Sequence, residues 1–247
     1  FDDTGKVSQH SPLVHAAGTW TAPDTLSAMS KTDMAYVITW YDQSGNNRNF
    51  TNATSAERPM IIYYGIQDNG PLFDAANDYL YCGYQFESGD DDYTYVGVCK
   101  TSSASTLQGL FSDHKGPNFN QGIEVLNRGN YWSHFVRDKD LNSSLAATTN
   151  PTIVNASFDN EGGTGSNNQK IRVNGAEETR TTNENLLASN RLQLVMGTRQ
   201  APVNSGVYTG GWTGNITEVV GFESQLTTAQ SETMEKNMAA HYNITLA

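Results

Sequence analysis

Short apolar and β-branched runs recur along the whole chain, and clusters of Gly, Pro, Asn and Asp separate them. Such runs suit the pleated, half-buried surface of a strand, while the clusters supply the residues that tight turns need. Many short strands with regular turn signals are typical of a β-sandwich or barrel, not of alternating strands and helices. Strands are expected at residues 60–65, 94–100, 109–112, 122–126, 131–136, 152–158, 170–173, 192–196 and 216–222.

One hairpin can be placed from its turn. Residues 170–173 alternate between polar and apolar side chains and run into Asn174 and Gly175. Asn-Gly is the favoured pair for a type I′ turn, which matches the twist of two antiparallel strands. Residues 176–180 are therefore expected to return alongside 170–173.

A strand expected at residues 36–41 runs straight into a dense turn signal. Asp42 and Ser44 can bond nearby backbone N–H groups, and Gly45 and Asn46 tolerate a positive φ. Alternating Asp and Asn oxygens also suggest a Ca²⁺ loop, but the spacing and the closing Glu of an EF-hand are absent. The sequence favours a structural turn held by its own side chains.

One helix is expected, near the end of the chain. Thr227 can cap it, and Gln230 three residues later completes a capping-box pattern. Met234, Met238 and Tyr242 then fall on one face at helical spacing. This face is expected to pack against a sheet.

The composition limits the classes of partner that the chain can bind. Only 15 Lys and Arg stand against 26 Asp and Glu, for a formal net charge of −11. Nucleic-acid binding needs clustered cations, so that class is excluded. No segment is apolar for long enough to enter a membrane. At 247 residues the chain is expected to form a single domain over 1–247. Because the sequence starts at Phe1 and not at Met, a leader or a longer sequence is expected to precede it.

The two cysteines fall on neighbouring strand-like runs. Cys82 and Cys99 would face each other if residues 79–84 and 93–100 formed a hairpin. The sequence allows either a disulfide across that hairpin or two buried free thiols. A disulfide needs a Cα separation below about 7 Å, which the sequence does not give. Neither cysteine has the spacing of a metal or redox motif.

Several segments in order resemble the concanavalin A-like, laminin G-like jelly-roll superfamily. They are Trp-Tyr-Asp-Gln-Ser-Gly-Asn from Trp40, Leu-Phe-Asp-Ala-Ala-Asn-Asp-Tyr-Leu from Leu72, Ile-Arg-Val-Asn-Gly from Ile171 and Trp-Thr-Gly-Asn-Ile-Thr-Glu-Val from Trp212. The resemblance implies an all-β jelly-roll sandwich of two antiparallel sheets with one short C-terminal helix. Relatives usually have a further strand before the position of Phe1, so an N-terminal edge strand is expected to be missing here.

The segment from Trp40 is also similar to the catalytic domain of the α-L-arabinofuranosidase B group, which implies a glycoside hydrolase. A retaining hydrolase needs two carboxyl groups about 5 Å apart. That enzyme group carries adjacent cysteines beside its site, and this sequence has none. No carboxylate of the group can be carried over to a position of this chain, so no catalytic residue is assigned.

Two clusters combine aromatic faces with polar groups, as sugar-binding sites do. Alternation along residues 131–136 puts Tyr131 on the face opposite Trp132. Tyr and Trp are also common in the core of a sandwich. Each cluster can therefore be either part of the core or a ligand site. The candidate ligand-binding residues are Tyr131, Trp132 and His134 in one cluster and Arg199, Tyr208 and Trp212 in the other.

Asp90, Asp91 and Asp92 form the densest acid cluster. In the superfamily that the chain resembles, Ca²⁺ at the rim of the sandwich often assists ligand binding. Adjacent acids on an extended chain point in different directions, however. A solvated acidic loop is the alternative, and no cofactor is required.

The chain resembles the jelly-roll superfamily but has no catalytic motif, and this leads to one hypothesis about its function and two alternatives. The chain is expected to be a non-catalytic module outside a cell or on a virion surface, where it binds glycans or neighbouring protein subunits. The first alternative is a glycoside hydrolase or polysaccharide lyase of the jelly-roll class. The second is a structural surface subunit whose partners are copies of itself.

Overall fold

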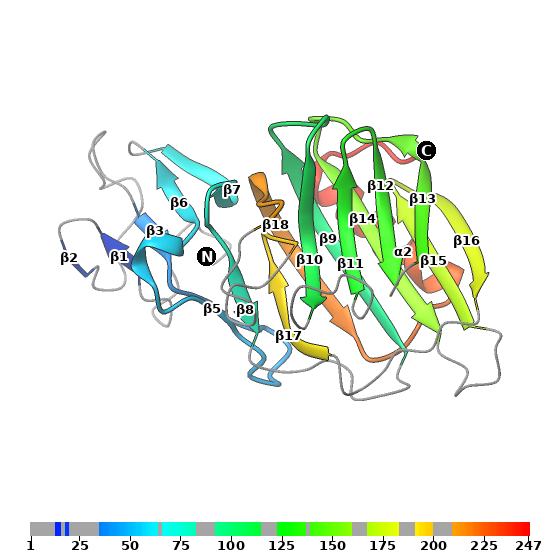
Figure 1. Cartoon of the computed structure of the whole chain (residues 1–247), viewed down its shortest axis with the longest axis horizontal. Helices are drawn as coiled ribbons and strands as arrows, with labels where there is room; N and C mark the ends of the chain where they lie inside the picture. The colour runs from blue at the N-terminus through cyan, green and yellow to red at the C-terminus, as the bar shows by residue number, and fades with distance from the viewer. Residues whose placement is uncertain are drawn as a thin grey trace.

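The computed structural model describes residues 13–15, 18–19, 35–63, 66–82, 92–114, 123–136, 139–159, 167–182, 191–199 and 209–247. They form two sheets in which every strand pair is antiparallel (Figure 1). In spatial order, the ten-stranded sheet contains β16 (Ala176–Thr182), β15 (Asn167–Val173), β14 (Thr152–Asp159), β9 (Tyr93–Thr101), β18 (Thr213–Phe222), β7 (Ile66–Asp74), β6 (Met60–Tyr63), β3 (Ala35–Val37), β1 (Leu13–His15) and β2 (Gly18–Thr19). The eight-stranded sheet contains β13 (Lys139–Ala146), β12 (Tyr131–Val136), β11 (Ile123–Arg128), β10 (Leu107–His114), β17 (Arg191–Met196), β8 (Leu80–Cys82), β5 (Phe50–Thr51) and β4 (Thr39–Trp40).

The predicted sandwich of two antiparallel sheets is confirmed, and each expected strand from residue 60 onward matches an observed one. The single strand expected at 36–41 is wrong. β3 and β4 belong to different sheets, because the chain crosses between them at Ile38. Val37 donates its N–H to Pro59 O on one side of this crossing, and Ile38 O accepts from Asn52 N on the other.

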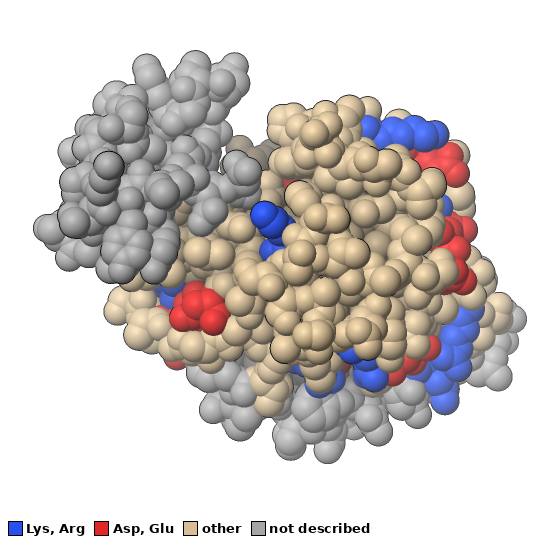
Figure 2. Space-filling model, turned by 90° about the horizontal axis from the view of Figure 1, so that it is seen from above, with Lys and Arg blue, Asp and Glu red and all other residues tan. Residues whose placement is uncertain are grey.

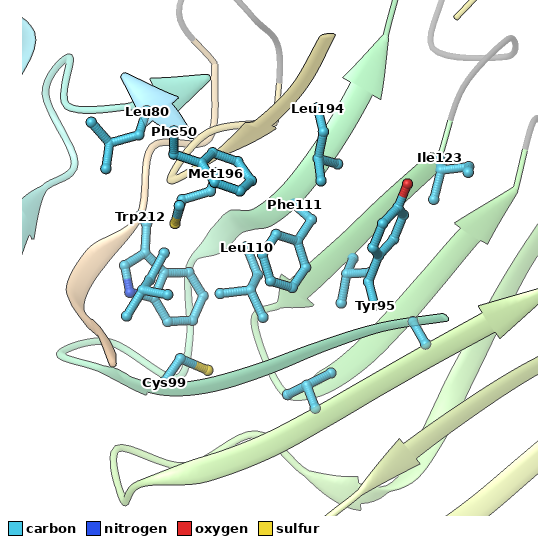
Figure 3. Packing of buried hydrophobic residues seen from close by; sticks show 14 of the residues in the cluster. Phe50, Leu80, Tyr95, Cys99, Leu110, Phe111, Ile123, Leu194, Met196 and Trp212 are labelled. Carbon is cyan, nitrogen blue, oxygen red and sulfur yellow. The ribbon is translucent and has the colours of Figure 1, made fainter. Parts of the chain in front are cut away.

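Apolar side chains from both sheets fill the space between them (Figure 3). Phe111 and Ile123 come from the eight-stranded sheet, and Tyr95 and Cys99 come from the ten-stranded sheet. All four are at most 1% exposed. Burial on this scale, at about 25 cal/mol per Å² of apolar surface, is the main force that holds the two sheets together.

Helix α2 (Thr228–Tyr242) covers the outer face of the ten-stranded sheet, behind β14 and β15 in Figure 1. Its predicted capping box is present, with the Thr227 side chain accepting from Gln230 N. Met238 is buried against Val96, Val98 and Ile153 of the sheet. The prediction that this helix packs against a sheet is therefore confirmed. No described helix is long and apolar enough to cross a bilayer.

A buried ion pair also fastens α2 to the sheet. Arg172 of β15 donates from Nε to Glu235 Oε1 at 2.9 Å and to Oε2 at 3.1 Å. The two side chains are only 6% and 1% exposed. Asn155 of β14 donates to the same Glu235 oxygen at 3.0 Å. A charge removed from water in this way needs these partners, since a buried unpaired charge is strongly destabilising.

The two predicted turns are present. Asn174 and Gly175 both have a positive φ, of 46° and 92°, and they join β15 to β16 in register. The Asp42 carboxylate accepts from Ser44 N, Ser44 Oγ and Arg48 N at 2.8–2.9 Å. Burial acts to raise the pKa of Asp42, but the hydrogen bonds from Arg48 and Ser44 hold it below its ordinary value. A short 3₁₀ turn follows at Ser55–Glu57.

The cysteine hairpin is wrong. Cys82 lies in β8 of the eight-stranded sheet, whereas Cys99 lies in β9 of the ten-stranded sheet. Both residues are buried thiols, and no disulfide joins them. Burial raises the pKa of the Cys99 thiol, which keeps it protonated.

Candidate functional site

The outer face of the eight-stranded sheet carries a row of side chains that are polar except for Phe135. Asp140 of β13, Phe135 of β12, Glu124 of β11 and Ser112 of β10 lie side by side in register. Inward neighbours such as Val125 belong to the core, so alternation directs this row away from it. We use the name outer-face site for Glu124, Arg128, Tyr131, Asp140 and Arg199, together with Leu107 at its margin.

A two-point ion pair lies at the centre of the outer-face site. Arg199 donates from Nη2 to Glu124 Oε2 at 2.9 Å and from Nε to Oε1 at 3.2 Å. The Glu124 side chain is 0% exposed and that of Arg199 is 14% exposed. Parallel bonds of this kind fix the guanidinium plane and the carboxylate plane together. The pair is therefore a rigid and largely buried ion pair, and only part of the Arg199 side chain reaches the surface.

Gly109 allows Arg199 to reach this position. A Cβ atom on Gly109 would lie 2.5 Å from the Thr198 carbonyl carbon, because the backbone of residues 198–199 passes directly over β10. Backbone bonds hold that crossing in place, from Arg199 N to Thr209 O at 3.1 Å and from Gly109 N to Gly210 O at 2.8 Å. Glycine is required here for a close approach of two backbones.

Gly109→Ala is expected to push residues 198–199 off the sheet and to lower the free energy of unfolding by about 1–3 kcal/mol, the usual cost of overpacking. The Arg199–Glu124 bond should lengthen or break. Urea unfolding would measure the first effect. Gly45→Ala is a matched control for an added methyl group, because a Cβ atom on Gly45 meets nothing within 4 Å and only its φ of +85° is strained. Gly45→Ala should lose about 1 kcal/mol through this φ alone, and a Gly109→Ala variant with no loss of stability would contradict the close-approach account.

The second half of the outer-face site is more exposed. Arg128 Nη1 lies 3.0 Å from Asp140 Oδ2, with the two side chains 29% and 30% exposed. Ser133 donates to the other Asp140 oxygen at 2.9 Å. Among the described groups, nothing bonds the buried Nε of Arg128. Leu107, opposite Arg128 in register, is 43% exposed. Charged hydrogen-bonding groups thus stand beside an apolar surface.

The sequence-predicted residues divide between this face and the core. Tyr131 and Arg199 lie in the outer-face site, both partly exposed. Trp132 and Trp212 are 1% and 0% exposed and stack on each other, with ring centroids 5.8 Å apart. Their faces are therefore covered by core. Tyr208, Asp90 and Asp91 lie outside the described residues, and Asp92 directly precedes β9.

His134 also lies between the sheets. Its Nε2 is 2.8 Å from Tyr93 Oη and its Nδ1 is 2.9 Å from Lys170 O, so both nitrogens contact the opposite sheet. Burial lowers the pKa of His134 to about 4. A neutral imidazole with both nitrogens bonded links the two sheets.

Sequence reasoning missed Glu124, Arg128 and Asp140. A signal for Glu124 was present, because a lone acid stands between Ile123 and Val125 in an apolar strand. Buried acids need a partner, so this position points to an ion pair or a site. The pairing of Arg128 with Asp140 depends on the β12–β13 register, which the sequence does not reveal.

Two carboxylates on one face raise the question of hydrolysis. Glu124 and Asp140 are separated by β12, so their Cα atoms lie about 10 Å apart, two strand spacings. Each carboxylate is ion-paired with an arginine. A retaining mechanism needs carboxyl groups about 5 Å apart, one of them protonated to act as the acid. These two carboxylates therefore do not fit a retaining pair. In the described part of the chain, no group of three His, Cys, Asp or Glu side chains could hold a metal ion.

A small cavity of about 40 Å³ lies beside residues 198–199, lined by Asp78, Asn77, Thr198, Thr209 and Gly210 among others. Asp78 is 7% exposed and accepts from Asp74 N at 3.0 Å. Burial, together with the neighbouring Asp74 charge, raises the pKa of Asp78 to about 7. At neutral pH this carboxyl group is partly protonated.

Asp78→Asn is expected to make unfolding less sensitive to pH. The pKa of Asp78 is raised in the folded state, so its contribution to stability is present below about pH 4 and is lost as the pH rises to about 7. The variant lacks this loss, so its stability relative to the natural protein should grow by about 1–2 kcal/mol between pH 5 and 8, after allowance for solvent screening. Urea unfolding across that pH range measures it. If the difference in free energy of unfolding between the variant and the natural protein stayed constant with pH, it would contradict the raised pKa of Asp78.

Comparison with known proteins addresses the fold. No protein-family model matches the chain, and no curated protein sequence matches it. The IT-sialidase CBM40 of Ruminococcus gnavus is similar in structure, with 16% identity, a TM-score of 0.50, and coverage of 59% of this chain and 83% of that one. Domain 4 of AbnA, a GH43 extracellular arabinanase from Geobacillus stearothermophilus solved in complex with arabinotriose, covers 75% of this chain and 81% of its own, with 15% identity and a TM-score of 0.50.

The chain has a concanavalin A-like jelly-roll fold. The resemblance read from the segments beginning at Trp40, Leu72, Ile171 and Trp212 is confirmed at the level of this fold. Similarity to the α-L-arabinofuranosidase B group stays a prediction. Within the jelly roll, α2 covers one outer face and the outer-face site lies on the other.

Proposed function

We propose that this jelly roll is a non-catalytic glycan-binding module. The observation that carries the proposal is the outer-face site, where the strand registers place Leu107 and Tyr131 on either side of Arg128, which pairs with Asp140. A sugar presents apolar ring faces and hydroxyl groups, and these match an aromatic surface beside fixed donors and acceptors. The partly exposed Arg199 adds a small polar area, and the buried Glu124 carboxylate balances its charge.

The similar structures support this proposal by analogy of fold alone. One is a sialidase carbohydrate-binding module, and the other was solved with arabinotriose bound. A shared fold does not carry function by itself. We infer a location outside the cell or on a virion surface from the same analogy and from the composition, and self-association stays a prediction.

A glycan array with the purified chain tests the proposal. Selective binding of one glycan class is the expected result, and no binding above background would overturn it. The same preparation should be incubated with arabinan, alginate and β-glucan, because the release of reducing ends would favour the hydrolase or lyase class instead. An assembly of identical chains without glycan binding would favour the structural-subunit class.

A further inference from the structure

A second hollow lies at one end of the sandwich, next to the outer-face site, since Ala146 of its lining pairs in register with Tyr131. It is a groove of about 500 Å³ that opens between the end of β13, the β15–β16 turn and the segment after α2. Figure 1 shows the C-terminus beside the end of β13. Ligand-binding clefts usually measure about 300–1,000 Å³, so the groove is large enough for a small ligand.

The lining of the groove is uncharged. It contains the amides of Asn150, Asn174 and Asn243 over apolar side chains that include Leu145 and Ile244. Seen from this end, the molecule shows a broad area without charged side chains, and most of the charged ones lie around its margin (Figure 2). Such a lining offers little to compensate an ion for lost water, so it selects against charged ligands.

The amides come from three separate segments and are fixed in different ways. Asn174 and Asn243 both adopt a left-handed backbone, with φ of 46° and 54°. Asn174 Oδ1 accepts from Ile153 N at 2.8 Å, which orients its amide plane and leaves its NH₂ group available. Ala247 donates to Asn174 O at 2.7 Å and so ties the C-terminal segment to the turn.

The other two amides are available for a ligand. Asn150 and Asn243 are exposed, and within the part of the chain that the structure describes their side chains form no hydrogen bond. A carboxamide presents both a donor and an acceptor. Vicinal sugar hydroxyls require both, while the C–H faces of a sugar ring suit an apolar floor such as Leu145 and Ile244.

We propose that this groove is a second carbohydrate site, which takes a neutral oligosaccharide of about two or three residues, a size suited to the volume of a small-ligand cleft. Asn150, Asn174 and Asn243 bind its hydroxyls, and the apolar floor contacts a ring face. The inference stands on the groove alone and does not need the outer-face site to bind the same sugar.

Calorimetric titration with arabinotriose, maltotriose and cellotriose tests this site. The test variant is Asn150→Ala/Asn243→Gly, in which glycine keeps the left-handed helix cap while the amide is removed. At least one trisaccharide should bind the natural chain, and the double variant should weaken it about tenfold, the effect of losing two hydrogen bonds. Asn237→Ala removes an exposed amide on α2 outside the groove and should bind as the natural chain does.

Two results would overturn the groove proposal. One is that none of the three trisaccharides binds, and the other is that the double variant binds with unchanged affinity. Tyr131→Ala separates the two sites, because Tyr131 pairs with Ala146 but is not itself part of the groove lining, so its removal should leave binding in the groove intact. If Tyr131→Ala abolished trisaccharide binding and the double variant did not, the sugar would occupy the outer-face site, and only the groove proposal would fail.

Discussion

Glu235→Ala is expected to lower the free energy of unfolding by about 3 kcal/mol, because the buried Arg172 guanidinium loses one of its two carboxylate partners and keeps only Glu177, at 2.8 Å. Arg172 is 6% exposed at its side chain, so water cannot replace the lost carboxylate. Asn155 loses its acceptor in the same variant. Urea unfolding of the purified chain measures the effect, and helix α2 should detach first.

The matched control lies on the same helix. Glu232 forms an exposed i,i+4 pair with Lys236, and the two side chains are 44% and 67% exposed. Glu232→Ala should cost less than about 0.5 kcal/mol, as exposed helix pairs do. Comparable losses in Glu232→Ala and Glu235→Ala would contradict the fastening role of the buried pair.

Trp132→Ala is expected to cost about 3–5 kcal/mol, the range for large-to-small changes of a buried aromatic residue. Trp132 stacks on Trp212 across the two sheets, so its removal leaves a cavity lined by a second large ring. Thermal and urea unfolding should both show the loss. Trp132→Phe keeps part of the ring contact and should lose less.

The adjacent residue provides the comparison. Tyr131 points to the outer face, so Tyr131→Ala should change the free energy of unfolding by less than about 1 kcal/mol, as for surface positions. If Tyr131→Ala were as destabilising as Trp132→Ala, the assignment of these neighbours to opposite faces would be wrong.

Much of the fold could be predicted because its signals are local. Alternation separated Tyr131 from Trp132, Asn174 and Gly175 identified a hairpin, and Thr227 with Gln230 located a helix start. Each of these depends on residues within a few positions of one another, where backbone geometry and side-chain period decide the structure.

The sequence did not predict which of the two sheets each strand joins. Cys82 and Cys99 lie on consecutive strands, yet the chain passes from one sheet to the other between them. The segment 36–41 likewise crosses between sheets at Ile38. A local pattern identifies a strand but does not state which sheet it joins, because pairing depends on strands far away in sequence.

The same reason limited the candidate site. Arg199 and Tyr131 were predicted from their chemistry, but the partner of Arg199 is Glu124, 75 residues earlier. Arg128 and Asp140 meet only through the hairpin of β12 and β13. Of the predicted aromatic residues that the structure describes, Trp132 and Trp212 lie in the core, since a large ring fills the space between sheets as readily as it stacks on a ligand.

The affinity of Tyr131→Ala for the glycan selected on the array tests the central claim most directly. The outer-face site predicts that loss of the Tyr131 ring weakens binding about tenfold, equivalent to a ring contact of about 1.4 kcal/mol. Asn150→Ala/Asn243→Gly should leave this affinity unchanged. Unchanged binding by Tyr131→Ala, in a variant that unfolds at the natural temperature, would contradict the assignment of glycan binding to this face.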